Sequence, residues 1–340
     1  MVKVSVIIPN YNHALFLDRR IESILNQTFQ DFEIIFLDDN STDRSKEVFA
    51  RYEDNPRITH AIFNAENSGS TFKQWNKGFS LAAGEYAWIA ESDDYAAPRF
   101  LEELVAIMEQ NKNVGLVYCQ SCLVDNKDEI ISPNFLEYTD CFNSKRWNAS
   151  YLNVGKDECI NFLAAKNTIP NASAVLIRKS VYRSEVDRGN EIFKVTGDWF
   201  TWSKILLVTD IYFVPQSLNY FRFSQGSVSR NNSKLALIVE ESLSIVEQIE
   251  ERVPISDRAK EIFFGLVSSW WLSYLISEKV LFKRELDSYL KIVKYAPSYK
   301  FIFSLHWQLG VVLLKRLRYL IKLGTRFKTL KNYLKVRTLV

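Results

Sequence analysis

The chain has 340 residues, of which 47% are hydrophobic and 14% aromatic, so it can bury a sizeable core and is not disordered as a whole. Its length leaves room for two domains, or for one large domain with an appendage. The net charge is only +3, and no window of about 18 uncharged apolar residues predicts a membrane-spanning helix.

The first ninety residues alternate apolar runs with segments of helical spacing. The amino terminus lacks the basic start and long apolar core of a signal peptide, so we expect the chain in the cytosol. Ser41 or Thr42 is the expected cap of a short helix, with Asp43 in its first turn. Strands that alternate with helices predict a parallel, doubly wound sheet. The expected strands cover residues 4–8, 32–37, 58–63 and 86–90, and the expected helices include 15–25 and about 70–82.

Polar and acidic residues follow three of these strands. Because ligands bind outside the carboxyl ends of the strands in such sheets, we expect these residues to face one crevice. The acids that follow the fourth strand suit a divalent cation whose shell phosphates can complete, or they form a solvated loop that caps the next helix. The residues are Pro9 to Asn12 after the first strand, Asp38 and Asp39 after the second, and Glu91, Ser92, Asp93 and Asp94 after the fourth.

The second half of the chain is less regular. Residues 125–167 interleave polar and aromatic residues, and we interpret them as an irregular lobe that covers the crevice. Beyond residue 234 helices with few turn signals follow, so we place a domain boundary near 230, between 1–230 and a helical C-terminal region, 231–340. The expected strands here cover 114–119, 174–177 and 214–223, and the expected helices 99–111 and 197–207.

Several single residues have both a functional and a structural interpretation. Asp38 and Asp39 can accept hydrogen bonds from a base or ribose, although Asp39 can also cap a helix. Tyr11 offers a flat face on which a base can stack, or it lies in a half-buried turn. Lys73 and Lys77 lie four residues apart on a predicted helix, where they meet phosphate oxygens or remain solvated.

Asp198 follows a glycine at the start of an aromatic helix. It is either a helix cap or a general base whose pKa is raised by apolar neighbours. The three histidines form no nucleophilic triad and no phosphate-binding glycine loop occurs, so metal-assisted phosphate chemistry remains. Cys119 and Cys122 form a single C-x-x-C inside an apolar run, and we expect core thiols there, not zinc ligands.

The opening V-S-V-I-I-P-N-Y-N, the run L-N-Q-T-F-Q-D-F-E-I-I-F-L-D-D-N-S-T-D and the acidic E-S-D-D together resemble the family 2 glycosyltransferases, inverting enzymes with the GT-A fold. The resemblance covers about residues 2–229. It implies an α/β fold with a Rossmann-like, doubly wound mixed sheet, divided into a nucleotide-binding half (1–120) and an acceptor half (121–230). It also implies transfer of one sugar from a nucleoside diphosphate, with uridine as the expected base, to a glycan or lipid-linked glycan in cell-envelope or capsular polysaccharide synthesis.

The resemblance further implies roles for individual residues. Tyr11 would stack on the base and Asp39 would accept from its ring N–H. Asp93, assisted by Asp94, would coordinate the Mn²⁺ or Mg²⁺ that bridges the diphosphate, and Asp198 would be the catalytic base. The expected nucleotide-binding residues are Pro9, Tyr11, Asn12, Asp38, Asp39, Lys73, Asn76 and Glu91.

Three positions depart from the family pattern. Glu91 replaces the first acid of the D-x-D motif, Trp75 stands where many relatives have Arg, and Ser224 stands where many have His. These departures leave open a catalytically silent homologue that binds nucleotide and acts as a scaffold in glycan assembly. A nucleotidyltransferase would share a similar sheet and acidic site, but the absent glycine-rich loop argues against it. Because the Q-x-x-R-W motif of processive synthases is also absent, we expect a single addition.

The end of the chain is basic and amphipathic. From Lys315 onward it has nine Lys or Arg residues and no acid, and Phe303 and Trp307 precede them. Such a segment predicts peripheral binding to the cytoplasmic face of a membrane, and a helical bundle with a solvated basic face is the alternative. Nucleic acid is not an expected partner, because no recognised binding module accompanies the basic residues.

Overall fold

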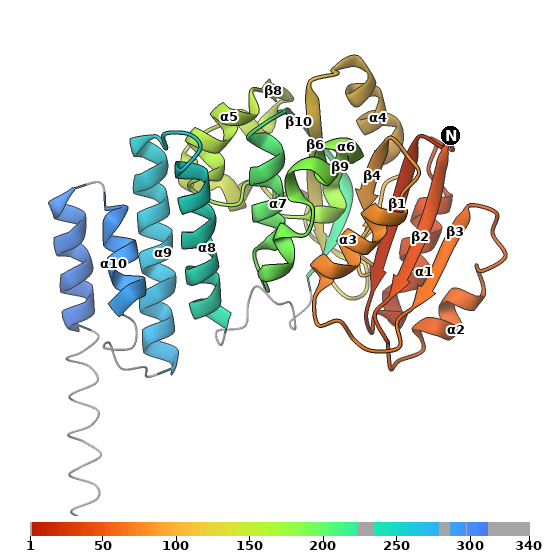
Figure 1. Ribbon diagram of the computed structural model, residues 1–340, viewed down its shortest axis with the longest axis horizontal. Helices are drawn as coiled ribbons and strands as arrows, with labels where there is room; N and C mark the ends of the chain where they lie inside the picture. The colour runs from red at the N-terminus through yellow and green to blue at the C-terminus, as the bar shows by residue number, and fades with distance from the viewer. Residues whose placement is uncertain (1, 224–233, 279–285, 297, 312–340) are drawn as a thin grey trace, which may run out of the picture.

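A computed structural model describes residues 2–223, 234–278, 286–296 and 298–311 (Figure 1). Two predictions, on Ser224 and on the basic segment from Lys315, lie outside these residues.

A ten-stranded mixed sheet forms the centre of the molecule, in the order β3-β2-β1-β4-β9-β6-β10-β5, with β7 beside β6 and β8 beside β10. The first four strands are parallel, β9 is antiparallel between β4 and β6, and β6 and β10 are parallel to each other. This confirms the predicted α/β class with a doubly wound mixed sheet. The strands are β1 (Val4–Asn10), β2 (Phe32–Asp38), β3 (Ile58–Phe63), β4 (Tyr86–Ile89), β5 (Tyr95–Ala96), β6 (Val114–Val124), β7 (Ile130–Ser132), β8 (Tyr151–Asn153), β9 (Val175–Arg178) and β10 (Asp210–Arg222).

Helices cover both faces of the sheet because alternate residues of the buried strands point to opposite sides. Val4 and Val6 belong to a hydrophobic cluster with residues of α1, α2 and α4, whereas Ile7 belongs to a second cluster with Trp75 of α3 and Trp202 of α7. The helices are α1 (Ala14–Leu25), α2 (Ser45–Ala50), α3 (Thr71–Leu81), α4 (Phe100–Gln110), α5 (Gly155–Glu158), α6 (Lys179–Val181), α7 (Gly197–Leu206), α8 (Leu235–Glu250), α9 (Asp257–Glu278) and α10 (Leu286–Lys294).

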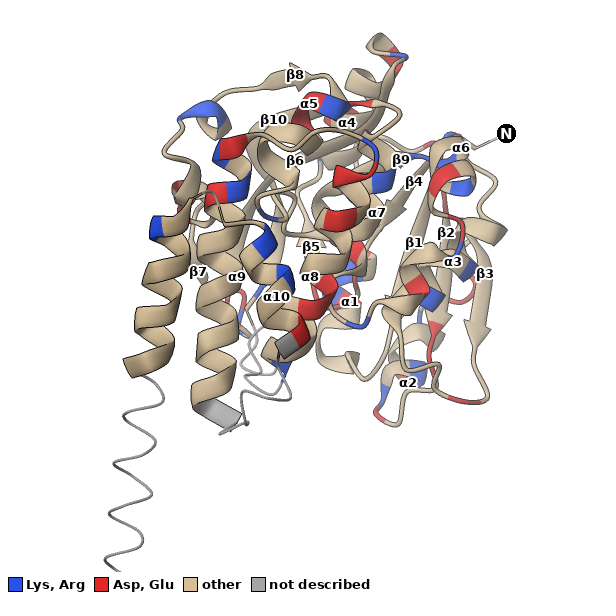
Figure 2. Cartoon of the chain, turned by 60° about the vertical axis from the view of Figure 1, so that its left-hand side comes forward, with Lys and Arg blue, Asp and Glu red and all other residues tan. Residues whose placement is uncertain are grey.

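The C-terminal helices form a layer outside α7, and α8 is the one nearest to it in Figure 1. A further helix covers residues 299–311, and in Figure 2 it is tan over most of its length because Lys300 is its one Lys, Arg, Asp or Glu. None of the described helices is long and apolar enough to cross a bilayer.

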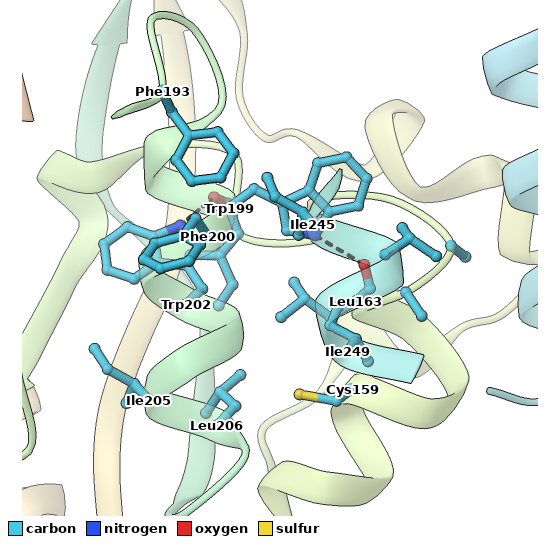
Figure 3. Close-up of a cluster of buried hydrophobic side chains, with 14 of the residues drawn as sticks. Cys159, Leu163, Phe193, Trp199, Phe200, Trp202, Ile205, Leu206, Ile245 and Ile249 are labelled. Carbon is cyan, nitrogen blue, oxygen red and sulfur yellow. Dashed lines mark hydrogen bonds between the residues drawn. The ribbon is translucent and has the colours of Figure 1, made fainter. Parts of the chain in front are cut away.

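The hydrophobic core continues from the sheet into the C-terminal helices. Ile245 and Ile249 of α8 lie beside Trp199 and Leu206 of α7 (Figure 3), and all four side chains are buried in one cluster with the strand residue Ile7. The sheet and α8 therefore share a single core.

Strand β1 continues through Pro9 to Asn10, beyond its predicted end at residue 8, and strands β6 and β10 extend furthest beyond their predicted bounds. Strand β6 does not end at Cys119 but continues through the polar pair Gln120 and Ser121, which is buried. Ser121 accepts a hydrogen bond from Asn219 of β10, and the Gln120 side chain accepts one from the backbone of the following loop. The apolar run ends at Cys119 because the next two residues are polar. They can still continue the buried strand because distant segments of the folded chain supply their hydrogen-bond partners. Strand β10 likewise begins at residue 210 and not at 214.

The start of α2 also differs from the prediction. The helix begins at Ser45, and Asp43 accepts hydrogen bonds from the Ser45 backbone N–H and hydroxyl, at 2.9 and 2.6 Å. The residue before the helix is Arg44, whose side chain makes no capping bond, so neither Ser41 nor Thr42 is the cap; Ser41 instead hydrogen-bonds to Asp38, and Asp43 precedes the helix and does not lie in its first turn.

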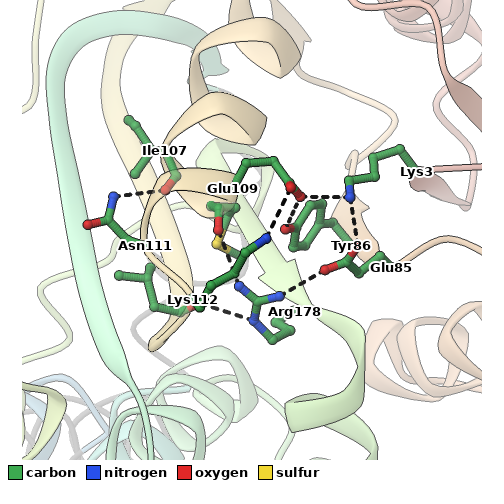
Figure 4. A network of polar contacts seen from close by, with 10 residues as sticks. Lys3, Glu85, Tyr86, Ile107, Glu109, Asn111, Lys112 and Arg178 are labelled. Atoms are coloured by element: carbon green, nitrogen blue, oxygen red, sulfur yellow. Dashed lines mark hydrogen bonds and ion pairs between the residues drawn. The ribbon is translucent and has the colours of Figure 1, made fainter.

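A charged network joins β4, β9 and α4 at the amino-terminal ends of the parallel strands (Figure 4). Lys3 lies 2.7 Å from both Glu85 and Glu109, and Arg178 lies 3.0 Å from Glu85. These pairs are partly exposed and contribute about 0–1 kcal/mol each. They leave the carboxyl ends of the strands, where the acids of the E-S-D-D run lie, at the other edge of the sheet.

Candidate active site

The carboxyl ends of β1, β2 and β4 open into one cavity of about 600 Å³, which we call the strand-end cavity. The register that pairs Asn10 with Asp38 and Ile7 with Ile89 brings the three strand ends to the same level. The predicted residues that line this cavity are Pro9, Tyr11, Asp39, Glu91, Asp93, Asp94 and Asp198.

The acids of the E-S-D-D run have different environments. Glu91 accepts a hydrogen bond of 2.8 Å from the indole N–H of Trp75, and burial, followed by the charge of Asp93, raises its pKa to about 8. Asp94 is also buried, which raises its pKa, and it accepts a hydrogen bond of 2.8 Å from the backbone N–H of Arg222. Asp93 and Glu91 are both partly exposed, whereas Asp94 is buried; because Glu91 accepts from Trp75, Asp93 is the best placed of the three to meet a ligand in the cavity.

A buried arginine lies behind these acids. Arg20 of α1 has no exposed surface and donates from Nε to the backbone oxygen of Glu91 at 2.8 Å, and its two terminal nitrogens have no hydrogen-bond partner among the residues that the structure describes. Burial lowers its pKa to about 10, while the charges of Asp94, Asp93 and Glu91 oppose that shift. Arg20 thus offsets part of the like-charge repulsion within the acidic run.

Asp39 holds the loop that precedes α3. Its carboxylate accepts hydrogen bonds from Asn64 and Gln74 and from both the backbone N–H and the hydroxyl of Ser68, at distances of 2.7–3.1 Å. Neighbouring Tyr11 is 46% exposed, so its ring is available on the other side of the loop. Asp39 therefore fixes the cavity wall as well as lining it.

Four predicted residues lie outside the lining of the strand-end cavity. The carboxylate of Asp38 accepts from Asn10 and Ser41, and Asn12 joins the β1 and β2 loops through a hydrogen bond from the Thr42 N–H. Asn76 is buried and hydrogen-bonds to Asn190, Glu191 and Tyr182, and Lys73 donates to the Ser68 backbone at 3.3 Å. The contacts of Asp38, Asn12 and Asn76 are structural within this chain.

Asp198 lies in the first turn of α7, where its two carboxylate oxygens have separate partners. One accepts from Asn167 at 2.9 Å and the other from the backbone N–H of Trp199 at 2.7 Å. Burial raises the pKa of Asp198 to about 6, although both hydrogen bonds oppose that shift. A carboxylate with this pKa is mostly ionised at neutral pH and can still accept a proton, which is what a general base requires.

A second cavity of about 650 Å³ is also lined by Asp198, and we call it the aromatic cavity. Its walls include Phe135, Tyr138, Trp199 and Trp270. Pro170, Val195, Asp198 and Phe221 line both cavities, so the Asp198 side chain stands on a shared wall.

Whether the site can bind a divalent metal depends mainly on Asp93. Asp93 offers hard oxygens of the kind that Mg²⁺ and Mn²⁺ prefer. Within the described ranges no group of three or more His, Cys, Asp or Glu side chains is arranged to hold a metal ion. Glu91 and Asp94 are engaged by Trp75 and Arg222, so the site fits a metal that takes most of its ligands from a bound diphosphate.

Sequence reasoning missed several residues of this site. Arg20, Gln74 and Asn167 touch the acids at 91, 39 and 198 respectively, from positions 31 to 71 residues away. His13 also lines the cavity, with its Nδ1 2.9 Å from the Ser92 hydroxyl. No local pattern marks these side chains, because each acquires its role from a partner distant in the chain.

Residues 5–184, more than half of the chain, match the family described as "Glycosyl transferase family 2". Over 256 residues the chain is 29% identical to the glycosyltransferase GlyG of Streptococcus pneumoniae, covering 68% of this chain and 75% of GlyG. It is 32% identical over 132 residues, 38% of this chain and 41% of the relative, to the GalNAc(5)-diNAcBac-PP-undecaprenol beta-1,3-glucosyltransferase of Campylobacter jejuni. A glycosyltransferase of Nostoc sp. is 36% identical over 132 residues, and the chain spans 40% of its length.

The fold matches solved glycosyltransferase structures. TarS residues 1–349 of S. aureus in complex with UDP align with a TM-score of 0.62 at 17% identity, covering 87% of this chain and 81% of TarS. The mannosyltransferase PcManGT of Pyrobaculum calidifontis, in complex with GDP-Man and Mn²⁺, aligns with a TM-score of 0.53 at 15% identity over 93% of this chain and 87% of PcManGT. This likeness confirms the GT-A-like fold.

Proposed function

The chain belongs to glycosyl transferase family 2, and from this premise we propose that it transfers one sugar, with inversion, from a nucleoside-diphosphate donor to a glycan or lipid-linked glycan. The observation that carries the proposal is the place of Asp198, on the wall shared by the strand-end cavity and the aromatic cavity. A base between two cavities can meet an acceptor hydroxyl in one while the donor occupies the other.

The reaction is a single displacement at the anomeric carbon. The acceptor oxygen attacks, its proton passes to the Asp198 carboxylate, and the bond between the anomeric carbon and the phosphate oxygen breaks with its electron pair going to the nucleoside diphosphate. Asn167 and the Trp199 N–H hold the carboxylate in place for this transfer. Because the two cavities adjoin at Asp198, the acceptor hydroxyl in one and the anomeric carbon of the donor in the other would meet beside this carboxylate, in the orientation that such a displacement needs.

The strand-end cavity is the proposed donor site. Tyr11 would stack on the base, Asp39 would accept from its ring N–H, and Pro9 and Glu91 would contact the nucleoside. A uridine base is supported by the sequence resemblance and by the structural likeness to TarS, which was solved with UDP. Lys73 is exposed and donates to the backbone oxygen of Ser68, between the lining residues Asn67 and Gly69, and from there it would meet phosphate oxygens.

Asp93 would hold the divalent metal, with Asp94 supporting the loop. The metal, Mn²⁺ or Mg²⁺, would supply positive charge that stabilises the departing diphosphate. The Mn²⁺ in the complex of PcManGT supports this assignment.

The aromatic cavity is the proposed acceptor site. Sugar rings pack on aromatic side chains, and Phe135, Tyr138 and Trp270 provide such faces around Asp198. The name of the Campylobacter relative, which acts on an undecaprenol-linked glycan, supports a lipid-linked acceptor in cell-envelope or capsular polysaccharide synthesis.

The donor assignment is tested by thermal unfolding with UDP, dTDP, GDP and CDP, each with and without Mn²⁺. A ligand at 100 times its dissociation constant adds about 2.7 kcal/mol to the unfolding free energy, which raises the melting temperature measurably. We expect a rise with UDP that needs the metal and is lost in Asp93→Asn. No rise with any nucleotide would favour the silent scaffold over a working transferase.

We also propose that the chain binds the cytoplasmic face of a membrane peripherally. Tyr299, Phe303 and Trp307 recur every four residues on the helix 299–311 and are 90%, 71% and 68% exposed. In the sequence nine Lys or Arg residues follow from Lys315 onward, and each basic residue near an anionic surface adds about 1 kcal/mol to binding.

Co-sedimentation with vesicles tests membrane binding. We expect binding to vesicles that contain phosphatidylglycerol, weaker binding to phosphatidylcholine alone, and loss in the double variant Phe303→Ser with Trp307→Ser. Equal recovery of wild type and variant would contradict the proposal.

A further inference from the structure

A buried carboxylate of α8 holds the backbone that leads to Asp198. Glu241 is 7% exposed and accepts hydrogen bonds from the backbone N–H groups of Lys194, Val195 and Thr196, at 2.6, 3.0 and 2.8 Å. Its Oε2 also accepts from the Thr196 hydroxyl at 2.9 Å. Successive N–H groups that converge in this way form an anion-binding concavity, and here the anion is a side chain of the same protein.

The held segment ends at the proposed base. Thr196 is the residue before α7, and Asp198 is the second residue of that helix. Val195 lines both cavities, and Lys194 lines the strand-end cavity. The position of this segment therefore sets the direction from which Asp198 enters the shared wall.

The remainder of α8 fixes Glu241 against α7. Ile245 and Ile249 follow Glu241 at intervals of four residues, so the three side chains lie on one face of the helix. Both isoleucines are fully buried beside the α7 residues Trp199 and Leu206 (Figure 3). Helix α8 is thus packed tightly enough to act as a fixed support.

We propose that Glu241 is a positioning residue for Asp198, so that the C-terminal helical region is a working part of the active site. The inference rests on the proposed function, in which Asp198 is the general base. Helix α8 also contributes directly to the aromatic cavity, which is lined by its residues Leu235, Ile238 and Ser242.

The charge of Glu241 allows a second measurement, the pKa of Asp198, which distinguishes loss of this charge from a general loss of structure. Burial is the main cause of the raised pKa of Asp198; the negative charge of Glu241 acts in the same direction, with an effect smaller than those of the opposing hydrogen bonds from the Trp199 N–H and Asn167. Removing that charge should lower the pKa of Asp198, whereas the other charged groups around the base stay unchanged. Among the described residues, the other charged or titratable side chains that line the cavities with Asp198 are Tyr11, His13, Asp39, Glu91, Asp93, Asp94, Lys194 and Lys234 in the strand-end cavity and Glu137, Tyr138 and Lys166 in the aromatic cavity.

The experiment compares Glu241→Gln with Glu240→Gln, the same change at the exposed neighbouring position. Hydrolysis of UDP-glucose, UDP-GlcNAc and GDP-mannose with Mn²⁺ is followed through the released nucleoside diphosphate, and Asp198→Asn defines the turnover that depends on the base. We expect Glu241→Gln to lower kcat by about 10- to 100-fold, since a displacement of about 1 Å can cost that much. The donor KM should stay within about twofold, because the strand-end acids are untouched.

The pH profile gives the second readout. The acidic limb of kcat should move to lower pH in Glu241→Gln and stay in place in Glu240→Gln. Glu241→Asp, which keeps the charge, should retain the wild-type limb and recover part of kcat.

Four outcomes overturn the inference. If Glu241→Gln folds and has the same kcat and the same acidic limb of the pH profile as Glu240→Gln, the inference is overturned and the proposed function is unaffected. Wild-type turnover that Asp198→Asn does not reduce, or no turnover of any donor, overturns both. If Glu241→Gln does not fold, Thr196→Val removes one of the four hydrogen bonds without leaving a buried charge unpaired, and an unchanged kcat in that variant overturns the inference.

Discussion

At the scale of single residues, burial gives ordinary carboxylates different properties in one site. Asp198 lies among aromatic groups and has a pKa raised to about 6. Glu91 lies beside Asp93 and has a pKa raised to about 8. Burial penalises the charged form in both cases, and the hydrogen bonds to each carboxylate only partly restore it.

The pH dependence of the reaction should report Asp198. Only its ionised form can accept the acceptor proton, so the rate should fall as pH decreases through about 6. Asp198→Asn should lower kcat by about 10²- to 10⁴-fold while nucleotide binding persists. Steady-state kinetics between pH 5 and 8 measures the effect on kcat, and a thermal-shift assay shows whether the variant still binds nucleotide.

The same group should also affect stability. A folded pKa above the usual value of 3.8 favours the protonated form, so the stability this gives is lost as pH rises through about 6. Asp198→Asn should therefore be more stable than wild type at pH 8, by about 1–2 kcal/mol after allowance for the open cavity, and the difference should disappear near pH 4. Urea denaturation at several pH values tests the sign, and a less stable variant at pH 8 would contradict it.

Trp75 illustrates a residue that departs from the family pattern and gains a partner of its own. Its indole N–H donates to Glu91, and its ring stacks on Trp202, with centroids 6.1 Å apart. Two of the departures seen in the sequence, at 75 and 91, are thus one contact in the structure.

Trp75→Phe should weaken metal-dependent nucleotide binding, because Glu91 loses the hydrogen bond that favours its charged form. Trp202→Phe is the matched control, since it removes an equivalent buried indole that donates to the Ile169 backbone and touches no acid. Both variants should lose about 1–3 kcal/mol of stability, and only Trp75→Phe should reduce affinity. Titration with UDP and Mn²⁺ decides this, and equal affinities in the two variants would show that the Glu91 contact has no part in binding.

At the scale of elements, a buried ion pair between Arg146 and Glu158 stabilises the irregular lobe of residues 125–167. Arg146 lies 2.7 Å from the buried carboxylate of Glu158, the last residue of α5, and its guanidinium lies over the rings of Tyr151 and Phe162 at 3.7 and 3.9 Å. Asn153 donates to the same carboxylate at 2.8 Å. These contacts join the segments before and after β8.

Removing one partner should be costly. Arg146→Met leaves the carboxylate of Glu158 buried without its countercharge and should lower the unfolding free energy by about 3–5 kcal/mol at pH 8. Because burial already raises the pKa of Glu158, protonation should reduce this loss at lower pH. Adding Glu158→Met to Arg146→Met should restore much of the stability, and denaturant titrations of the single and double variants compare them. A double variant as unstable as the single one would refute this account.

At the scale of the whole molecule, the C-terminal helices and the sheet share one hydrophobic cluster. It includes Ile7 of β1, Trp202 of α7, Leu243 of α8 and Phe263 of α9. A core that crosses the expected boundary near residue 230 favours cooperative unfolding of both parts.

We therefore expect a single unfolding transition for the full chain, with coincident far-ultraviolet circular dichroism and tryptophan fluorescence. A chain that ends at Lys234 should aggregate, because it would expose Trp199 and Leu206 to water and lose Glu241. Light scattering and gel filtration of that truncation test the expectation. Two separate transitions, or a soluble folded truncation, would instead support independent domains.

The sequence by itself determined the class of fold and the place of the site. Strands such as 4–8 and 32–37 are short buried runs whose pattern depends only on local residue types, and acids directly after them mark the carboxyl edge of a parallel sheet. The family motifs likewise lie in continuous stretches of chain. Information of this kind is local, so it can be recognised before folding is known.

Only the tertiary structure decided which partners hold each acid. Asp39 bonds to Gln74 and Ser68, Asp198 to Asn167, and the segment before Asp198 to Glu241, over separations of 29 to 47 residues. Burial and hydrogen-bond partners set the pKa and orientation of a carboxylate, and both depend on which distant segments pack together. For that reason the predicted acids were visible in the sequence, while the residues that hold them were not.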